Sequence, residues 1–245
     1  MSIRQSINDA RAIFYNFVTN YNIIKRSVMI VMIGYLSLLI IGVITAALLD
    51  PDGYTIWDNW ISDLGSLDHT PAPILYDIAC IIAGSMTIPL TFYLEQLLAP
   101  LPNREDLGEQ HYSRLRFRLS SFAFLFSIIG NLGYIGVGIF SADRDYEFLS
   151  ILGERPHGIM SYLAFGGFTF GAFFMGWLIV LYSTKIPKIL GIYGIFGPLT
   201  VSILNLIDST PFLEWLLLFS ILVWIIPISI IILLKPELNI RSIQK

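Results

Sequence analysis

The chain has 245 residues, of which 55% are hydrophobic and only 13% are charged, and its formal net charge is −3. Soluble proteins carry about 25% charged residues, so this composition excludes an ordinary soluble domain. The acidic balance also excludes a basic patch for nucleic acid, so no nucleic-acid partner is expected. The composition therefore predicts an integral membrane protein whose main partners are membrane lipids.

The first 26 residues predict a short amphipathic helix. Apolar residues recur there at intervals of three and four, which places them on one stripe of a helix. They are Ile3, Ile7, Ala10, Phe14, Phe17 and Tyr21. We expect this helix to lie on the cytoplasmic membrane surface, with packing against the inner end of the membrane domain as the alternative.

Six hydrophobic segments follow, and each is long enough to cross a bilayer, which takes about 20 apolar residues. They are residues 27–49, 72–98, 117–140, 157–183, 188–207 and 212–234. The polar lead before the first segment is too long for an ordinary signal peptide, so this segment should remain as a span. The predicted fold is an all-α integral membrane bundle of six transmembrane helices in one domain, followed by a tail at 235–245.

Basic residues predict the orientation, because Lys and Arg are retained on the cytoplasmic side of a membrane. Thirteen of the 15 Lys and Arg residues fall in the termini and in the second and fourth connections, whereas only Arg144 and Arg155 fall in the others. Both termini should therefore be cytoplasmic, in the cell membrane. The connections 50–71, 141–156 and 208–211 should face outward.

Polar residues within the predicted spans gather toward the outward ends. Such residues cost free energy in lipid and usually face a bundle interior or a wet cavity. Intervals of three and four place several of them on shared helix faces. Four helices should thus line one outward-facing polar cavity, through Asp77, Asn131, Tyr134, His157, Ser161, Ser202, Asn205 and Asp208.

The first outward connection contains an aromatic and acidic segment between Tyr54 and Ser66. Trp57 and Trp60 lie three residues apart, and tryptophan prefers the headgroup region of a membrane. We expect the segment to lie along the outer surface, with Ser62 or Asp63 capping a turn that Gly65 permits.

Three short motifs carry a resemblance to a known family. They are Ile61-Ser62-Asp63-Leu64-Gly65, Gly138-Ile139-Phe140 at the end of the third span, and His157 at the start of the fourth. Over residues 27–234 the chain resembles an uncharacterised prokaryotic family of six-helix membrane proteins. That family is distantly similar to the DRAM autophagy modulators, the GPI-anchor remodelling factors and the regulators of plasma-membrane lipid asymmetry.

The resemblance implies a six-helix bundle with an outward site and a role near lipids. It brings no catalytic mechanism. Such proteins often have Pro and Glu after the aromatic residue of the third helix, whereas this chain has Ser141-Ala142-Asp143. A carboxylate role at that turn therefore does not carry over.

Three chemical readings compete for Asp63, Asp77 and His157. They could bind a metal with the help of His69, because imidazole and carboxylate are the ligands of catalytic zinc. They could instead be catalytic, with His157 as general acid or base and Ser161 or Ser62 as nucleophile, for acyl transfer or hydrolysis of a lipid. In the third reading, His157 and Asp63 are a hydrogen-bonded structural pair that pins the first loop.

Two other features predict little chemistry. Cys80 is the single cysteine, so it forms neither an internal disulfide nor a multi-thiolate site. Acidic residues at 143, 145, 147 and 154 have the spacing of a calcium loop, but Phe148 stands where the turn needs glycine. No metal and no cofactor is predicted.

The sequence thus favours a protein that binds or modifies a lipid or lipid-like molecule. The predicted catalytic residues are His157, Asp63, Asp77 and Ser161, and the predicted substrate-binding residues are Ser62, Asn131, Tyr134, Asn205, Trp57 and Trp60. Alternatives are a regulatory subunit that binds a protein partner or a second copy, and a small-solute transporter, for which bends at Pro89 and Pro198 are the argument.

Overall fold

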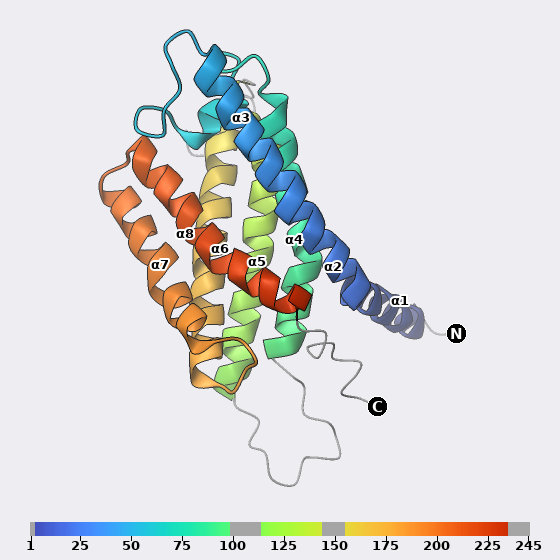
Figure 1. The fold of residues 1–245 in the computed structure, drawn as a ribbon. Coiled ribbons are helices and arrows are strands. Elements are labelled where there is room, and N and C mark those ends of the chain that lie inside the picture. The colour runs from blue at the N-terminus through green and yellow to red at the C-terminus, as the bar shows by residue number, and fades with distance from the viewer. Residues whose placement is uncertain (1–2, 99–113, 144–154, 235–245) are drawn as a thin grey trace.

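The computed structural model describes residues 3–98, 114–143 and 155–234, and this part of the chain folds into helices without a strand (Figure 1). The helices α1 to α3 and two short elements come first: α1 (Ile3–Val18), α2 (Tyr21–Ile30), the π-helix η1 (Val31–Tyr35), α3 (Leu36–Leu49) and the 3₁₀-helix η2 (Ile61–Gly65). The remaining helices are α4 (Ile74–Leu98), α5 (Arg114–Ile139), α6 (Pro156–Leu181), α7 (Lys188–Ile207) and α8 (Pro211–Leu234).

Six helices are long and apolar enough to cross a membrane, which confirms the prediction of a multi-pass helical protein. The first is the continuous helix Tyr21–Leu49, formed by α2, η1 and α3, and it begins six residues before the expected span. The other five bounds agree with expectation within three residues. A helix satisfies its own backbone hydrogen bonds, which is what a hydrocarbon environment requires.

Some sequence predictions fall outside the described residues. They concern part of the basic second connection at 99–113, the calcium-like spacing at 144–154, and the tail at 235–245. The cytoplasmic placement of both termini remains a prediction.

Glycines bring α4, α5 and α6 into close contact. A methyl group at Gly84 of α4 would lie 2.6 Å from the carbonyl oxygen of Asn131 in α5. A methyl group at Gly130 of α5 would lie 2.9 Å from the backbone nitrogen of Phe168 in α6, and one at Gly167 would lie 2.8 Å from the carbonyl of Phe126. Small residues therefore let these backbones meet, as they do in membrane helix pairs.

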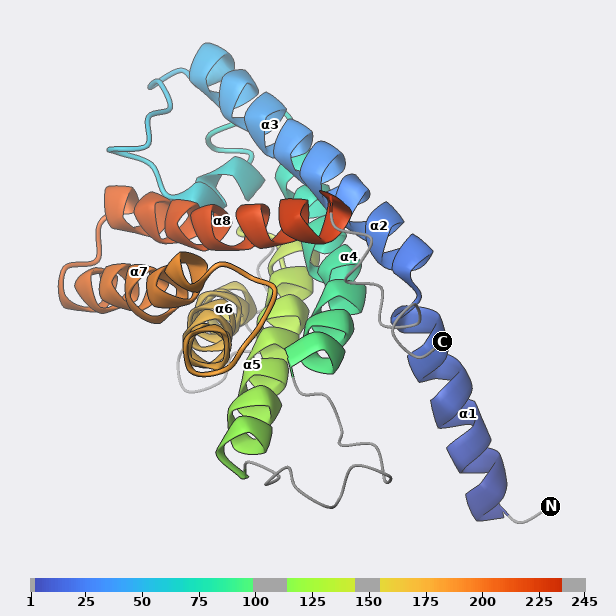
Figure 2. The same cartoon turned by 60° about the horizontal axis from the view of Figure 1, so that its bottom comes forward.

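The spanning helices pack in chain order, each against the next, from α3 to α8. The ring closes where α2 meets α8 at the end that carries α1, because the Tyr21 hydroxyl donates to the carbonyls of Ile232 and Leu233 at 3.1 and 3.3 Å. Toward the opposite end, α3 and α8 diverge in both views (Figures 1 and 2). We call this opposite end the η2 end, because η2 lies there between the two helices.

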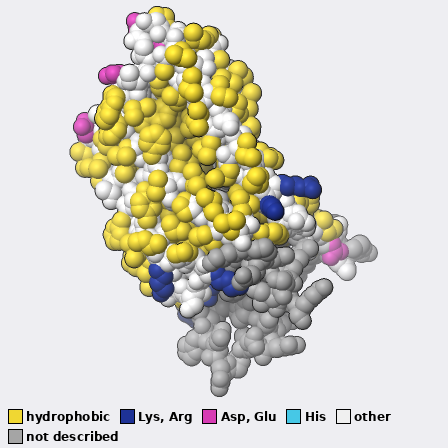
Figure 3. Space-filling model, in the orientation of Figure 1, with side chains coloured by type: hydrophobic (Ala, Val, Ile, Leu, Met, Phe, Trp, Pro, Cys, Tyr) yellow, Lys and Arg dark blue, Asp and Glu magenta, His cyan; other side chains and the backbone are white. Residues whose placement is uncertain are grey.

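Charge differs between the two ends of the bundle. Figure 3 shows an apolar flank with Lys and Arg toward the end that carries α1 and acidic side chains mainly at the η2 end. Because the flank has few charges and many exposed apolar side chains, its composition suits contact with lipid tails.

A substitution at Gly167 tests the glycine contact between α5 and α6. Gly167→Leu should lower the thermal unfolding temperature in detergent, because the side chain would overlap the backbone of α5. The free energy of unfolding should fall by about 1–3 kcal/mol. The matched control is Gly166→Leu, since a methyl group at Gly166 meets nothing within 4 Å. Equal unfolding temperatures for the two variants would show that the helices do not meet at this point.

Candidate functional site

A cavity of about 110 Å³ lies inside the bundle at mid-length, among α2, η1, α3, α4, α5, α6 and α8. One water needs roughly 10–15 Å³ of such space, so the cavity could hold several waters or a length of hydrocarbon chain. Its walls are largely apolar and include Met32, Leu36, Met86, Phe168 and Leu222. The cavity thus differs from the expected one, which was polar and lay at the outward ends of the helices.

One polar cluster on the cavity wall joins α4 to α5. The Thr87 hydroxyl donates to Asn131 Oδ1, and Asn131 Nδ2 donates to Thr91 Oγ1 at 3.0 Å. The Thr91 hydroxyl in turn donates to the carbonyl of Thr87 at 3.2 Å. Asn131 is 1% exposed, and its amide nitrogen has two protons, so a second donor remains after the bond to Thr91.

A second polar group on the wall is a pair of tyrosines. The hydroxyls of Tyr35 in η1 and Tyr134 in α5 lie 2.8 Å apart, and both side chains are buried and line the cavity. Tyr35 ends the π-helical segment Val31–Tyr35, which also supplies Val31 and Met32 to the wall. Single π-helical turns within longer helices occur frequently at functional sites.

The lining of this cavity contains no Asp, Glu, His, Lys or Arg among the residues described. Its polar groups are hydroxyls, one amide and one indole, which come from Tyr35, Thr87, Thr91, Ser127, Asn131, Tyr134, Trp224 and Ser229. An ion would be costly in such surroundings, whereas a neutral hydroxyl or carbonyl could be hydrogen-bonded there. The cavity therefore suits an uncharged, mostly apolar molecule.

The η2 end of the bundle is covered by the first connection. Ile61 and Leu64 of η2 are each 1% exposed and pack into the core cluster that contains Trp215. The backbone N–H of Ile61 donates to Glu214 Oε2 at 2.9 Å, and Trp215 Nε1 donates to the carbonyl of Asn59 at 3.1 Å. The connection therefore fits onto the start of α8 as a fixed cap.

Asp63 forms local contacts within this cap. Its Oδ2 accepts the backbone N–H of Trp60 at 2.8 Å, which confirms that Asp63 caps the turn. Gly65 does not permit the turn through an unusual backbone, since the positive φ among the described glycines belongs to Gly53. A methyl group at Gly65 would instead lie 3.1 Å from the ring of Tyr76, so close packing is what needs glycine there.

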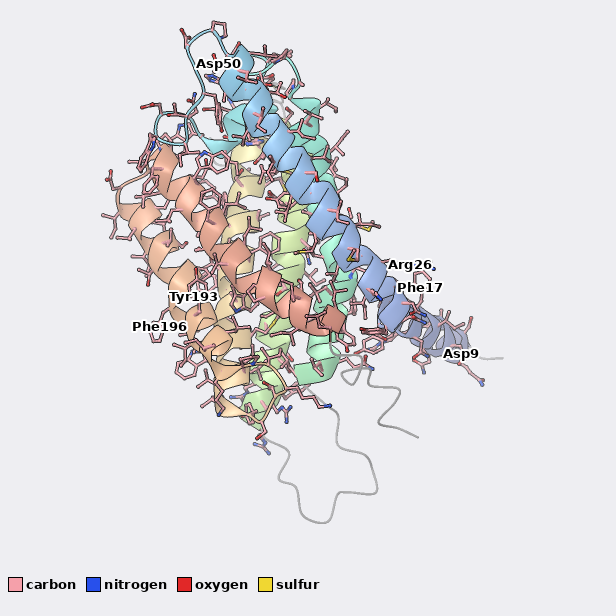
Figure 4. All side chains as sticks on the ribbon, in the orientation of Figure 1. Asp9, Phe17, Arg26, Asp50, Tyr193 and Phe196 are labelled. Carbon is pink, nitrogen blue, oxygen red and sulfur yellow. The ribbon has the colours of Figure 1, made fainter. Side chains whose placement is uncertain are left out.

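His69 lies between two carboxylates at the η2 end. Its Nδ1 is 3.2 Å from Asp50 Oδ2, and its Nε2 is 4.0 Å from Asp63 Oδ2 (Asp50 is labelled in Figure 4). Burial raises the pKa of the Asp63 carboxyl above its usual 3.8, and nearby Asp50 adds to the rise. The hydrogen bond from Trp60 and the nearby His69 partly offset these effects.

His157 does not pair with Asp63. Its Nδ1 donates to the carbonyl of Phe140 at 2.7 Å, so in the neutral ring Nε2 is an acceptor. That Nε2 is buried and has no hydrogen-bond partner within the described part of the chain. The predicted hydrogen bond between His157 and Asp63 is therefore wrong. His157 instead joins the start of α6 to the end of α5.

The other predicted site residues are distributed over several places. Asp77 is buried near Gly65, at the junction of η2 with the start of α4. Trp57 is 63% exposed and stacks on Phe212 with ring centres 4.3 Å apart, and the carbonyl of Trp60 accepts the Tyr54 hydroxyl. Half-buried Ser62, Ser161 and Asn205 lie off the cavity wall.

The structure thus brings together two of the predicted residues, Asn131 and Tyr134, on the cavity wall. Sequence reasoning missed Tyr35, Thr87 and Thr91. The interval of four between Thr87 and Thr91 was a usable signal, because it places both hydroxyls on one face of α4. Within the residues described, no group of three His, Cys, Asp or Glu side chains is arranged to hold a metal ion.

No protein-family model, no curated protein and no solved structure matches the chain.

Asp63→Asn should change how stability depends on pH. Because burial raises the folded-state pKa, the contribution of Asp63 to stability is fully present below the unfolded pKa of 3.8 and is lost as pH rises through the folded-state value. The variant keeps an oxygen that can accept the Trp60 N–H but cannot ionise. Its unfolding temperature in detergent should therefore fall less than that of the wild type as the pH rises from about 4.

The control for this measurement is Asp52→Asn, since Asp52 is exposed at the same end of the bundle. This variant should follow the wild-type profile. An Asp63→Asn profile parallel to that of the wild type would contradict the role given to burial.

Proposed function

We propose that the protein binds an uncharged lipid or lipid-like molecule in the cavity within its membrane-spanning bundle. The observation that carries the proposal is the lining, which is apolar over most of its area and has uncharged hydrogen-bonding groups at Asn131 and at the Tyr35–Tyr134 pair. Binding sites for small molecules are typically apolar with a few placed polar groups. A long-chain alcohol, an isoprenoid or another neutral lipid has this chemistry.

The partial exposure of the cavity wall at the side of the bundle supports a lipid ligand. The cavity is bounded on one side by η1 and α3 and on the other by α8, and these two walls diverge toward the η2 end. Wall residues on both sides are partly exposed, among them Met32, Leu36, Leu222 and Ile225. A molecule dissolved in the hydrocarbon could therefore enter without crossing the cap of buried Ile61 and Leu64.

Binding is proposed without a chemical step. His157 and Asp63, the residues suited to proton transfer, lie off the cavity wall, and the described wall itself contains no carboxylate, imidazole or amine. Serine and threonine hydroxyls are weak nucleophiles without such a partner. The geometry therefore supports recognition of a neutral lipid better than hydrolysis or acyl transfer.

Labelling with a photoreactive lipid tests this function. Purified protein in nanodiscs is irradiated with a diazirine derivative of hexadecanol, and the labelled peptides are mapped by mass spectrometry. We expect labels within α4, α5 and α8. Leu36→Trp and Leu222→Trp should each reduce this labelling several-fold, because the larger ring would occupy the cavity.

The matched control is Ile40→Trp. Ile40 lies one turn beyond Leu36, and its side chain is 57% exposed and lies off the cavity wall. It should leave labelling of α4, α5 and α8 unchanged. Labels confined to exposed lipid-facing side chains, or equal labelling in all three Trp variants, would overturn the proposed function.

Asn131→Leu tests the role of the polar wall. The substitution nearly preserves volume but removes the amide, so the cavity should lose preference for hexadecanol over hexadecane in a competition for the same labelling. A hydrogen bond contributes about 0.5–1.5 kcal/mol, so the loss should be roughly 2–12-fold. An unchanged preference would show that the hydroxyl of the ligand does not reach Asn131.

A further inference from the structure

The helix α1 lies across the bundle, not along it. In Figure 1 the helices α4, α5 and α6 run along the vertical axis, whereas α1 recedes from the viewer beside their lower end. Figure 2, turned by 60°, shows α1 at greater length and projecting away from the bundle. If α4 to α6 cross the membrane, α1 runs close to the membrane plane.

The depth of α1 is fixed by contacts with α4. The Tyr15 hydroxyl donates to Glu95 Oε2 at 2.9 Å, and the rings of Phe14 and Tyr15 pack edge-on against Phe92. Both α4 residues lie within two turns of Leu98, where α4 ends. These contacts hold α1 at the level of the helix ends, which is where the boundary of a bilayer would lie.

The connection to α2 keeps α1 at this level. Only Thr19 and Asn20 separate the two helices, and two residues span at most about 7 Å. Asn20 caps the start of α2, since its side chain accepts the backbone N–H of Asn22 at 3.0 Å. The break therefore redirects the chain without giving α1 freedom to leave the membrane boundary.

One face of α1 is apolar and largely exposed, although Phe14 on this face also touches Phe92 of α4. Ile7, Phe14 and Phe17 are 55–62% exposed, and their intervals of seven and three place them on one side of the helix. Ile13, at the margin of that side, is 71% exposed. A helix with this pattern at a bilayer boundary can bury its apolar face among headgroups and upper acyl chains.

Basic residues accompany this face. Arg11, Lys25 and Arg26 are exposed on α1 and α2, and further exposed Lys and Arg lie at the same end of the bundle (Figures 3 and 4). The latter are Arg114, Arg118, Lys185 and Lys188. Asp9 is the exposed carboxylate described on α1, so positive charge prevails and complements an anionic lipid surface.

We propose that α1 docks in the plane of an anionic membrane leaflet, with Ile7, Phe14 and Phe17 among the upper acyl chains and with Arg11, Lys25 and Arg26 at the level of the lipid phosphates. This interaction surface is independent of ligand binding in the cavity. The apolar face of α1 is thereby assigned to lipid. A second copy of the chain would present the same positive surface, whereas an anionic leaflet has the complementary charge.

Spin labels on the two faces of α1 test the docking in the full chain. In a Cys80→Ala background, Ile7→Cys and Phe14→Cys place labels on the apolar face, while Asn8→Cys and Ala12→Cys place them on the opposite face. The protein is placed in nanodiscs of phosphatidylcholine with 30% phosphatidylglycerol or of phosphatidylcholine alone. Power saturation then measures collisions with oxygen, which concentrates in the bilayer, and with a water-soluble nickel chelate.

Labels at positions 7 and 14 should favour oxygen, whereas those at 8 and 12 should favour the nickel chelate. The anionic lipid should increase the depth in the bilayer of the labels at positions 7 and 14. The triple substitution Arg11→Gln, Lys25→Gln and Arg26→Gln should remove the difference between the two lipid mixtures. Arg155→Gln, an exposed position at the η2 end, is the control and should keep the difference.

Several outcomes would overturn the proposal. Equal access of the nickel chelate to both faces would place α1 in water. Protection of positions 7 and 14 from both reagents would mean that protein covers the face, and label-to-label distances in doubly loaded nanodiscs would then identify a second copy. A lipid difference that persists in the triple variant would remove the role of the basic residues.

Discussion

The close approach of α4, α5 and α6 is the constraint on which the rest of the structure depends. Gly84, Gly130 and Gly167 remove the side chains that would otherwise hold these backbones apart. In a hydrocarbon environment, association of helices depends on such packing, because lipid tails are as apolar as the side chains. The three helices therefore form a tight slab, and the other helices pack around its edges.

The cavity follows from how the remaining helices meet this slab. The helix formed by α2, η1 and α3 packs on α4, and α8 packs on α7 and α6, but the two approach one another mainly where Tyr21 bonds to the end of α8. Away from that point they diverge, and the space between them is bounded by the slab. Asn131 and Tyr134 lie on the side of the slab that faces this space, and both line the cavity wall.

Much of the fold could be predicted from the sequence because the hydrocarbon makes simple demands. Long apolar runs predicted six spans, and the described residues contain six helices long and apolar enough to cross a membrane. The interval of three between Asn131 and Tyr134 predicted that both would face the interior, and both are buried. These inferences needed only the period of one helix, not the position of its neighbours.

The contacts between elements could not be predicted in the same way. Asp63 was expected to meet His157, but the backbone N–H of Trp60, three residues away, is a nearer partner, and short polar side chains often bond locally. Glu214 binds the N–H of Ile61, at a distance of 153 residues along the chain, which no local pattern encodes. The contribution of Tyr35 to the cavity depends on where the π-helical segment meets α5, which is again a tertiary feature.

Charge and polarity are separated along the bundle in a way that links these features. The carboxylates Asp50, Asp63 and Glu214 lie with the cap at the η2 end, whereas most of the exposed basic residues described, Arg155 excepted, lie at the end that carries α1. Between them, the polar groups of the described cavity wall are uncharged. An ion moving along the bundle axis would lose hydration at mid-length and find no opposite charge there, so the free-energy cost would remain uncompensated. The proposed neutral lipid would meet no such cost on entering sideways, because it would leave one apolar environment for another and would gain hydrogen bonds at Asn131 or the tyrosine pair.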